Sequence, residues 1–417
     1  MKIVVFNLGC KVNQYESDAI SQELREMGHF VTCDLEKADC YIINTCAVTN
    51  EAERKSRQAI TRCRKYNPKA KILICGCASQ KNPESFNKDG VIFMSGVGKK
   101  QDIIKHIDDL EFTQNLCDLP KIFENQNLTL PNRTRAYVKI QDGCDNFCSY
   151  CIIPYLRGRS RSRKIDDIVA EVTVLAKQTK EIVLIGISLQ QYGKDIGSSL
   201  VELNNALANI DVRIRLGSFY VDAIDENLLV SLKNMRNFCP HFHLSLQSGC
   251  DSVLKAMNRH YITAEYFDKV KLIRKFFPNV AITTDIIVGY PTETDIDFDI
   301  TMEFVKKVGF ADIHIFPFSS REGTRASKLK LINKEIVNSR KQKLLELKQE
   351  LIYNYLIENL SIKQDVLFEE KIDNYYVGYS KNYIRVYSAM DNVINQIVQI
   401  TPIEIYQDGL KGVYVNE

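Results

Sequence analysis

The sequence predicts an α/β protein in three parts: a parallel-sheet domain, a partial (β/α)6 barrel and a small C-terminal β-barrel. Strand-like and helix-like segments alternate twice along the chain, and such alternation produces parallel sheets with crossover helices. A long charged helical segment, 332–360, then leads into short strand-like segments, which predict the third part. A chain of 417 residues has ample length for two or three domains with substantial cores.

The first domain, residues 1–107, is predicted to hold a parallel sheet. Its first helix is expected to begin near Asn13, because Glu16 follows three residues later as in a capping box, and to end at Gly28. A charged helix is expected at 51–66. Short aliphatic runs predict the strands at 2–8, 40–44, 71–76 and 91–94.

A partial barrel is predicted for residues 132–355. The preceding residues, 108–131, lose periodicity and end at Pro131, so we expect a linker there, with room for one strand. Helices such as 166–177 and 264–277 separate six predicted strands, which matches part of a (β/α) barrel. The expected strands are 136–140, 181–185, 212–216, 241–246, 281–288 and 312–316.

Residues 356–417 have the size of a small five-stranded barrel, a fold that commonly holds RNA. The strand-like segments are 365–368, 376–380, 383–387, 396–400 and 413–415.

Composition indicates the cellular compartment of the protein but does not indicate a nucleic-acid partner. The formal net charge is only +3, so it does not predict nucleic-acid binding. No apolar run reaches the roughly 18–20 residues that span a bilayer, and the start of the chain does not resemble a signal peptide. Thirteen cysteines without a secretion signal predict a reducing compartment. We therefore expect a cytoplasmic protein without a membrane partner.

Cys144, Cys148 and Cys151 form a CxxxCxxC triplet. Three thiolates within a short loop can hold one face of a cubane iron–sulfur cluster and leave one iron open to chelate a small molecule. A zinc site is the alternative, but zinc usually takes two Cys-x-x-Cys pairs. The spacing, with the aromatic Tyr150 before the last cysteine, favours a cluster.

Three further cysteines, Cys10, Cys46 and Cys77, each follow a predicted strand of the first domain. The carboxyl ends of parallel strands meet at one edge of a sheet, so these thiols are expected to converge. An isolated cysteine is usually a small buried apolar residue, but three at successive strand ends favour a second cluster. Cys75 lies two residues before Cys77 and could compete for the third position.

A basic segment follows the first triplet. Arginines at alternate positions would share one face of a strand. A solvated edge and a site for phosphate or a cofactor carboxylate are about equally good interpretations. The segment contains Arg157, Arg159, Arg161, Arg163 and Lys164.

The CxxxCxxC spacing with Tyr150 resembles the radical S-adenosylmethionine superfamily. The resemblance implies a 4Fe-4S cluster on Cys144, Cys148 and Cys151 whose open iron binds the amino and carboxylate groups of S-adenosylmethionine. One-electron reduction then releases a 5′-deoxyadenosyl radical. It also implies that Tyr150 lies against the adenine of this cofactor.

Nearly end to end, the chain is similar to the methylthiotransferases of this superfamily, which join a three-cysteine domain, a radical barrel and an RNA-holding TRAM barrel. The segment Asn44-Thr-Cys46-Ala-Val-Thr49, with 51–57 after it, is similar to one branch of them. That branch modifies N6-threonylcarbamoyladenosine at position 37 of tRNA, next to the anticodon. The resemblance thus implies tRNA as substrate and a reductase or a flavodoxin- or ferredoxin-type electron donor.

By the same resemblance, Cys10, Cys46 and Cys77 hold an auxiliary 4Fe-4S cluster that carries the sulfur to be transferred. Cys77 is preferred to Cys75 because its Gly-Cys-Ala-x-Gln context matches the family. Further cofactor contacts are expected at strand ends of the barrel, although each of these residues could equally pack at the barrel mouth. They are Gly186, Ser188, Ser218, Gln247 and Asp285.

The implied reaction uses two S-adenosylmethionine molecules: one methylates the sulfur, and the other yields the radical that abstracts hydrogen from adenine C2. Radical chemistry suits this carbon, because an aromatic C–H has no acidic proton for a side-chain base to remove. Two alternative substrates are isopentenyladenosine in tRNA and a side chain of a ribosomal protein. A non-enzymatic alternative is an RNA-binding protein with structural or redox-sensing clusters.

Overall fold

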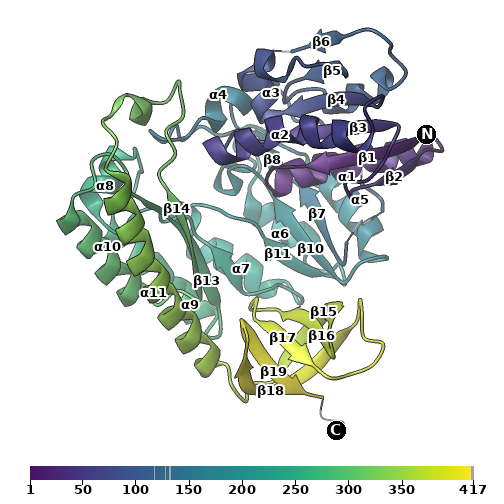
Figure 1. The fold of residues 1–417 in the computed structure, drawn as a ribbon. Coiled ribbons are helices and arrows are strands. Elements are labelled where there is room, and N and C mark those ends of the chain that lie inside the picture. The colour runs from purple at the N-terminus through teal and green to yellow at the C-terminus, as the bar shows by residue number, and fades with distance from the viewer. Residues whose placement is uncertain (117, 127, 131–132, 415–417) are drawn as a thin grey trace.

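The computed structural model describes residues 1–116, 118–126, 128–130 and 133–414. Figure 1 shows three parts in chain order: an N-terminal α/β domain, a central barrel flanked by helices, and a small C-terminal barrel drawn in yellow. Pro131 and residue 132, at the expected end of the linker, lie outside the described residues. None of the helices in the described ranges is both long and apolar enough to cross a membrane.

The N-terminal domain is a six-stranded parallel sheet in the order β2-β1-β3-β4-β5-β6. Short edge strands, β2 and β6, add to the four predicted strands, and β6 lies within the expected linker. The strands are β1 (Lys2–Asn7), β2 (Phe30–Thr32), β3 (Cys40–Thr45), β4 (Lys71–Gly76), β5 (Val91–Ser95) and β6 (Thr113–Asn115).

Helices cover this sheet. The first one, α1 (Lys11–Glu26), begins two residues before the expected start at Asn13, because Cys10 and not Asn13 occupies the N-cap position. The helix ends at Glu26, two residues before Gly28. The remaining helical segments are α2 (Asn50–Tyr66), α3 (Cys77–Lys81), η1 (Pro83–Phe86) and η2 (Lys100–His106).

Six parallel strands form the central barrel. They make two three-stranded sheets, β11-β10-β7 and β12-β13-β14, which isolated bridges join at Ile214–Phe238 and Phe219–Leu244. This arrangement confirms the predicted α/β barrel. The strands are β7 (Arg135–Lys139), β10 (Glu181–Ile185), β11 (Arg213–Leu216), β12 (His241–His243), β13 (Ala281–Val288) and β14 (Asp312–Pro317). A short antiparallel pair, β8 (Gln141–Asp142) and β9 (Arg161–Ser162), follows β7.

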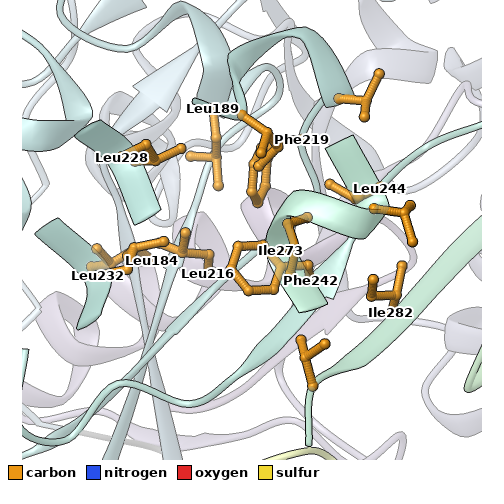
Figure 2. Packing of buried hydrophobic residues seen from close by; sticks show 14 of the residues in the cluster. Leu184, Leu189, Leu216, Phe219, Leu228, Leu232, Phe242, Leu244, Ile273 and Ile282 are labelled. Carbon is orange, nitrogen blue, oxygen red and sulfur yellow. The ribbon is translucent and has the colours of Figure 1, made fainter. Parts of the chain in front are cut away.

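An apolar core fills the space between these strands and their helices. Leu184, Leu216, Phe219 and Phe242 meet there from both sheets, and all four are almost completely buried (Figure 2). The helical segments are α4 (Ile153–Arg157), α5 (Ile165–Ala176), η3 (Leu189–Gln191), α6 (Leu200–Leu207), η4 (Val221–Ala223), α7 (Glu226–Asn234), α8 (Asp251–Ala256), α9 (Thr263–Phe276), α10 (Asp295–Val308), η5 (Arg325–Lys328) and α11 (Lys334–Glu358).

The C-terminal part is a closed barrel in the order β15-β16-β17-β19-β18. Val366, Phe368, Val386, Ile400 and Leu410 form its buried core. Figure 1 shows it below the central barrel, at the end of α11. The strands are β15 (Gln364–Ile372), β16 (Tyr375–Ser380), β17 (Arg385–Ser388), β18 (Ile397–Tyr406) and β19 (Gly409–Val413).

The C-terminal barrel seals the amino-terminal ends of the central strands. Arg135 in β7 pairs with Glu369 at 2.7 Å. In β11, Arg213 donates to the carbonyl of Asp365 at 3.0 Å and Arg215 to that of Lys381 at 3.0 Å. Buried guanidinium groups need such acceptors, so the two barrels form one packed body.

Candidate functional site

The first cysteine triplet lies on the loop that follows β7 and β8, at the carboxyl end of the central strands. Cys144 and Cys148 are buried and Cys151 is partly buried. Gly143 begins the loop at φ +72°, and a Cβ there would stand 2.0 Å from the carbonyl oxygen of Arg159. Only glycine permits this close crossing, which sets the direction of the cysteine loop.

Polar side chains from neighbouring strand ends contact the thiols. The Cys148 Sγ lies 2.9 Å from the Tyr220 hydroxyl, and the Cys144 Sγ lies 3.5 Å from the Ser188 hydroxyl. Arg259 approaches Cys148 Sγ to 3.7 Å with its Nη1 and stacks on the Tyr220 ring at 3.6 Å. The triplet is therefore held by groups that can donate hydrogen bonds to sulfur.

The chemistry of this donor set fits an iron–sulfur cluster. Burial raises the pKa of the Cys151 thiol to about 12 and also raises that of Cys144, and binding to iron would offset this effect by stabilising the thiolates. In the described ranges, no group of three or more His, Cys, Asp or Glu side chains is placed to hold a single metal ion. Three soft thiols on one loop are the ligand type that iron–sulfur clusters take.

The other residues expected at the cofactor are spread around this loop. Tyr150 packs against an apolar cluster that includes Met257 and Tyr290. Gly186 leaves room for Gln141, whose Oε1 accepts a hydrogen bond from the Ser188 N–H at 2.7 Å. Ser188 is thus fixed beside Cys144.

The last three expected contacts lie on the other strands. Gln247 is buried at φ +74° and donates its N–H to the Asp285 carbonyl at 2.8 Å. Asp285 pairs with His243 at 3.2 Å and, with Ser218, lines a cavity inside the barrel. Ser218 and Asp285 therefore face the barrel interior, whereas Ser188 is the expected contact that touches a cysteine.

Sequence reasoning missed Arg259 and Tyr220, the two residues that contact Cys148. Neither belongs to a motif with the cysteines: Tyr220 is 72 positions away and Arg259 is 111 positions away. A signal existed only for Tyr220, which lies two residues after the expected contact Ser218.

The second triplet lies at three neighbouring strand ends, as predicted. Cys10 follows β1 and caps α1, Cys46 follows β3, and Cys77 begins α3 directly after β4. These strands are adjacent in the sheet. Burial raises the pKa of Cys46 to about 11, and the neighbouring Cys77 and Cys10 raise it further. The three thiols therefore share one electrostatic environment and form a donor set of the same kind as the first.

Cys75 lies apart from that set. It is completely buried in an apolar cluster with Ile3, Val5 and Leu73 beneath α1. Cys77 belongs to a different cluster, with Ile43 and Ala78. Gly76, at φ +113°, turns the chain between them.

Hydrogen bonds hold the turns of the second triplet together. The Cys10 Sγ donates to Asn13 Oδ1 at 3.4 Å, and the Asn13 amide reaches Asn44 at 2.9 Å. The Cys46 N–H donates to the Ser56 hydroxyl at 3.1 Å. Asn13, Asn44 and Ser56 therefore fix the backbone at Cys10 and Cys46.

The basic segment after the first triplet is only partly a solvated edge, because Arg159 and Lys164 are exposed and the other three residues are buried. Arg157, Arg161 and Arg163 are buried, while Arg159 is exposed. Arg163 pairs with the buried Glu171. Carboxylates of the chain itself neutralise these buried arginines, so the phosphate-site interpretation is wrong for them as well.

A buried ion network centres on Arg157. Arg157 pairs with Glu16 of α1 at 3.0 Å and with Asp142 at 3.1 Å, and Lys139 bridges the same two carboxylates at 2.9 and 2.7 Å. Burial alone would raise the pKa of Glu16, but Arg157, Lys100 and Lys139 lower it. The network joins the N-terminal domain to the central barrel.

Arg157 also connects this network to the second triplet. Its Nη2 donates to Asn13 Oδ1 at 3.0 Å, and its guanidinium interacts electrostatically with Cys77 and Cys10. A fixed positive charge near thiols favours their thiolate form.

A cavity of about 750 Å³ occupies the interior of the central barrel, above the C-terminal barrel. Lys11, which follows Cys10 directly, reaches it from the N-terminal domain. Ser218 lines it two residues before Tyr220, which contacts Cys148. Residues of α11 and of the C-terminal barrel, such as Tyr355 and Tyr383, complete its wall, and its volume suits a ligand of nucleoside size.

Comparisons with known proteins agree with this architecture. A family model described as the radical SAM superfamily matches residues 138–305, and one described as uncharacterized protein family UPF0004 matches residues 2–96. The first model covers the CxxxCxxC loop and most of the central barrel. The second covers all three cysteines of the second triplet.

Two curated relatives have the same name, threonylcarbamoyladenosine tRNA methylthiotransferase MtaB. The protein of Thermotoga maritima is 41% identical over 338 residues, which are 79% of this chain and 78% of the relative. The protein of Bacillus subtilis is 35% identical over 422 residues, which are 96% of this chain and 93% of the relative.

Among solved structures, the chain is similar to the radical S-adenosylmethionine methyltransferase TsrM of Kitasatospora setae, solved with cobalamin and a [4Fe-4S] cluster. The TM-score is 0.53 at 13% sequence identity, over 76% of this chain and 74% of that one. At this identity the likeness concerns the fold alone.

Proposed function

Because the chain belongs to the radical S-adenosylmethionine methylthiotransferase family, we propose that it transfers a methylthio group to C2 of N6-threonylcarbamoyladenosine at position 37 of tRNA. One observation carries this proposal. The chain has two cysteine triplets at strand ends of two domains that a buried ion network joins, and it is 41% identical to a threonylcarbamoyladenosine tRNA methylthiotransferase over 79% of its length. One triplet would serve as the source of radicals and the other as the source of sulfur.

Two clusters are part of the proposal. Cys144, Cys148 and Cys151 would hold one 4Fe-4S cluster, and Cys10, Cys46 and Cys77 a second one. With S-adenosylmethionine bound, the first cluster supplies a radical that can remove hydrogen from an unactivated C–H bond. The convergence of each triplet and the soft sulfur donors support this assignment.

The protein's own side chains have definable tasks around these groups. Tyr220 and Arg259 can donate hydrogen bonds to the Cys148 sulfur, and Arg157 offsets negative charge at Cys10 and Cys77. Such donors near sulfur tune the electron affinity of a bound cluster. The buried network around Arg157 holds the N-terminal domain and the central barrel in fixed register.

We also propose further contacts between the protein and its cofactor. They are supported by position: each follows or lies within a strand of the central barrel, where substrates of such barrels bind. We propose that two S-adenosylmethionine molecules are used, and that the adenine of the one at the radical cluster lies against Tyr150. The contacts are Tyr150, Gly186, Ser188, Ser218, Gln247 and Asp285.

We assign residues 356–417 to a TRAM-like, RNA-binding domain and the rest of the chain to the divisions 1–107, 108–131 and 132–355. The closed five-stranded barrel supports this, since small barrels of that kind commonly hold RNA. A reductase or a flavodoxin- or ferredoxin-type protein would deliver the electron, and the cytoplasm would be the site of action.

Mass spectrometry of tRNA nucleosides from cells with and without this protein tests the function. The expected result is loss of the methylthio mark from threonylcarbamoyladenosine in the deletion strain and its return on complementation. Loss of the mark from isopentenyladenosine, or from a ribosomal protein, would replace the proposed substrate. If the reconstituted and reduced protein forms no 5′-deoxyadenosine from S-adenosylmethionine, the enzymatic function itself is wrong.

A further inference from the structure

Lysine and arginine outnumber aspartate among the residues that line the cavity inside the central barrel: Lys11, Arg135, Arg215, Lys348 and Arg385 against Asp285, Asp312 and Asp408. Most of its cations are already neutralised by carboxylates of the chain. Arg135 pairs with Glu369 at 2.7 Å, and Arg215 with Glu181 at 2.7 Å. Lys348 of α11 pairs with Asp312 at 2.9 Å. These pairs are part of the packing between the barrels and leave little capacity to bind a ligand.

Lys11 differs from these cations. It lines the cavity, and within the described ranges no carboxylate lies at ion-pair distance from it. Its ammonium lies within electrostatic range of Arg135, Arg215, Tyr383 and Asp285. The Asp285 carboxylate contacts His243 Nε2 at 3.2 Å and attracts Lys11 without forming an ion pair with it. Among the described residues, Lys11 is therefore a lysine that lines the cavity without an ion-pair partner.

The position of Lys11 is fixed by the second triplet. It is the first residue of α1, directly after the N-cap Cys10. The Cys10 thiol is hydrogen-bonded to Asn13, and Asn13 is held by Asn44 and Arg157. A group bound by Lys11 would consequently be held at a defined distance from Cys10, which suits a contact that orients a substrate toward that side of the cavity.

We propose that Lys11 binds the carboxylate of the threonylcarbamoyl group and thereby selects threonylcarbamoyladenosine over adenosines with an apolar N6 substituent. This inference rests on the proposed function, because the carboxylate belongs to the proposed substrate. The threonyl group ends in a carboxylate, whereas an isopentenyl group has no charge. A lysine without an ion-pair partner in the cavity favours the carboxylate and disfavours the isopentenyl group, because the apolar group would leave the ammonium desolvated and unpaired.

Two other anions could reach an ammonium here: a phosphate of the RNA backbone and the methionyl carboxylate of S-adenosylmethionine. A phosphate contact would strengthen binding of every RNA, whatever the substituent at position 37. A contact to S-adenosylmethionine would act without RNA. These sources can be separated experimentally.

The test uses the holoenzyme, kept anaerobic and without reductant, and three anticodon stem-loop RNAs of identical sequence. At position 37 they have threonylcarbamoyladenosine, its methyl ester, or isopentenyladenosine. The proteins compared are the wild type, Lys11→Met, Lys11→Arg and the matched control Lys348→Met, which removes a cavity lysine that is already paired. Fluorescence anisotropy gives each Kd at one fixed salt concentration.

The expected result is a selective change in one ratio. Wild type binds the acid more tightly than the ester, and Lys11→Met reduces this preference by about ten- to hundredfold, the usual effect of losing a charge-assisted hydrogen bond. Lys11→Arg retains most of the preference, and Lys348→Met retains it fully. Because the acid-to-ester ratio is taken within each variant, a general loss of binding or of cluster content does not affect it.

Equal weakening of all three RNAs by Lys11→Met would overturn the proposal in favour of a phosphate contact. The proposal would also be overturned if Lys11→Met weakened binding of S-adenosylmethionine and left the acid-to-ester ratio unchanged. An equal loss of the acid-to-ester preference in Lys348→Met would contradict it too. The proposed function is judged separately, by whether the reduced wild type forms the methylthio product on the threonylcarbamoyl RNA.

Discussion

Cys75 and Cys77 are two positions apart but lie in different apolar clusters of the first domain. Cys77 shares the environment of Cys46 and Cys10, whereas Cys75 is packed among aliphatic side chains. Burial raises the pKa of Cys75 to about 12, which fits a neutral thiol in an apolar core.

The pair allows a matched test of the second cluster. Cys77→Ala should reduce the iron content of the anaerobically reconstituted protein by about half, the content of one of two cubanes. Cys75→Ala should retain the iron and lose about 1 kcal/mol of stability, because it removes one buried sulfur atom. Iron analysis and thermal unfolding measure both. Loss of iron from Cys75→Ala alone would exchange their roles.

Glu293 gives a residue-scale prediction about pH. It is buried after β13, where its carboxylate accepts the Gly289 N–H at 2.5 Å and lies 3.5 Å from Arg340. Burial raises its pKa from 4.5 to about 7. Between these values the folded protein binds more protons than the unfolded chain, so this group makes stability fall as pH rises from about 4.5 to about 7.

Glu293→Gln should remove this contribution. The difference in unfolding free energy, variant minus wild type, is expected to increase by about 1–3 kcal/mol from pH 5 to pH 8. Urea unfolding of both proteins at the two pH values measures it. Parallel pH profiles would show that Glu293 does not titrate in this range.

At the scale of elements, the turn from β4 into α3 places Cys77. Gly76 stands there at φ +113°, and a Cβ on it would lie 2.5 Å from the Thr45 carbonyl oxygen at the end of β3. The ends of β3 and β4 can approach each other this closely only because the residue is glycine. Cys46 and Cys77 follow these two strand ends.

Gly76→Ala should therefore separate these strand ends. We expect a loss of about 1–3 kcal/mol in stability and a reduced iron content at the second triplet. Gly28→Ala is the matched control: its φ is +87°, but no atom lies within 4 Å of the added Cβ. Gly28→Ala should lose about 1 kcal/mol of folding stability and retain the iron of the second triplet. Equal iron loss in both variants would contradict the proposed role of the turn.

Elements were predictable where the signal is local. Aliphatic runs gave the long strands, and the rule of strand ends gave the placement of Cys10, Cys46 and Cys77 after three neighbouring strands. The edge strands β2 and β6 have three residues each, too few for a periodic pattern. The buried roles of Arg157 and Arg259 depend on partners more than 100 positions away, such as Glu16 and Cys148. Sequence spacing contains no signal for such contacts.

At the scale of the whole molecule, the C-terminal barrel is a structural part of the central one. It supplies acceptors to Arg135, Arg213 and Arg215 at the base of the cavity. Tyr383 stacks on His241 at 4.6 Å and lies 4.8 Å from the Arg215 guanidinium. An RNA held by this barrel would thus be connected to the wall of the cavity by rigid contacts.

Deletion of residues 361–417 should destabilise the central barrel as well as weaken RNA binding. Removing the partner of a buried charge typically costs about 3–5 kcal/mol of folding stability. This deletion exposes or unpairs three arginines. Arg135→Met in the shortened chain should recover part of the loss, because it removes one uncompensated charge. Thermal unfolding of both shortened chains measures this. An unchanged midpoint after deletion would show that the two barrels are independent.

The ion network around Arg157 also bears on how freely such enzymes can be recombined. Glu16 and Lys100 come from the N-terminal domain, and Lys139, Asp142 and Arg157 come from the central barrel. A chimera that joined this N-terminal domain to a foreign radical barrel would bury charges without their partners. We therefore expect the two domains to be exchanged and inherited as one unit, with sequence changes at these positions occurring in compensating pairs.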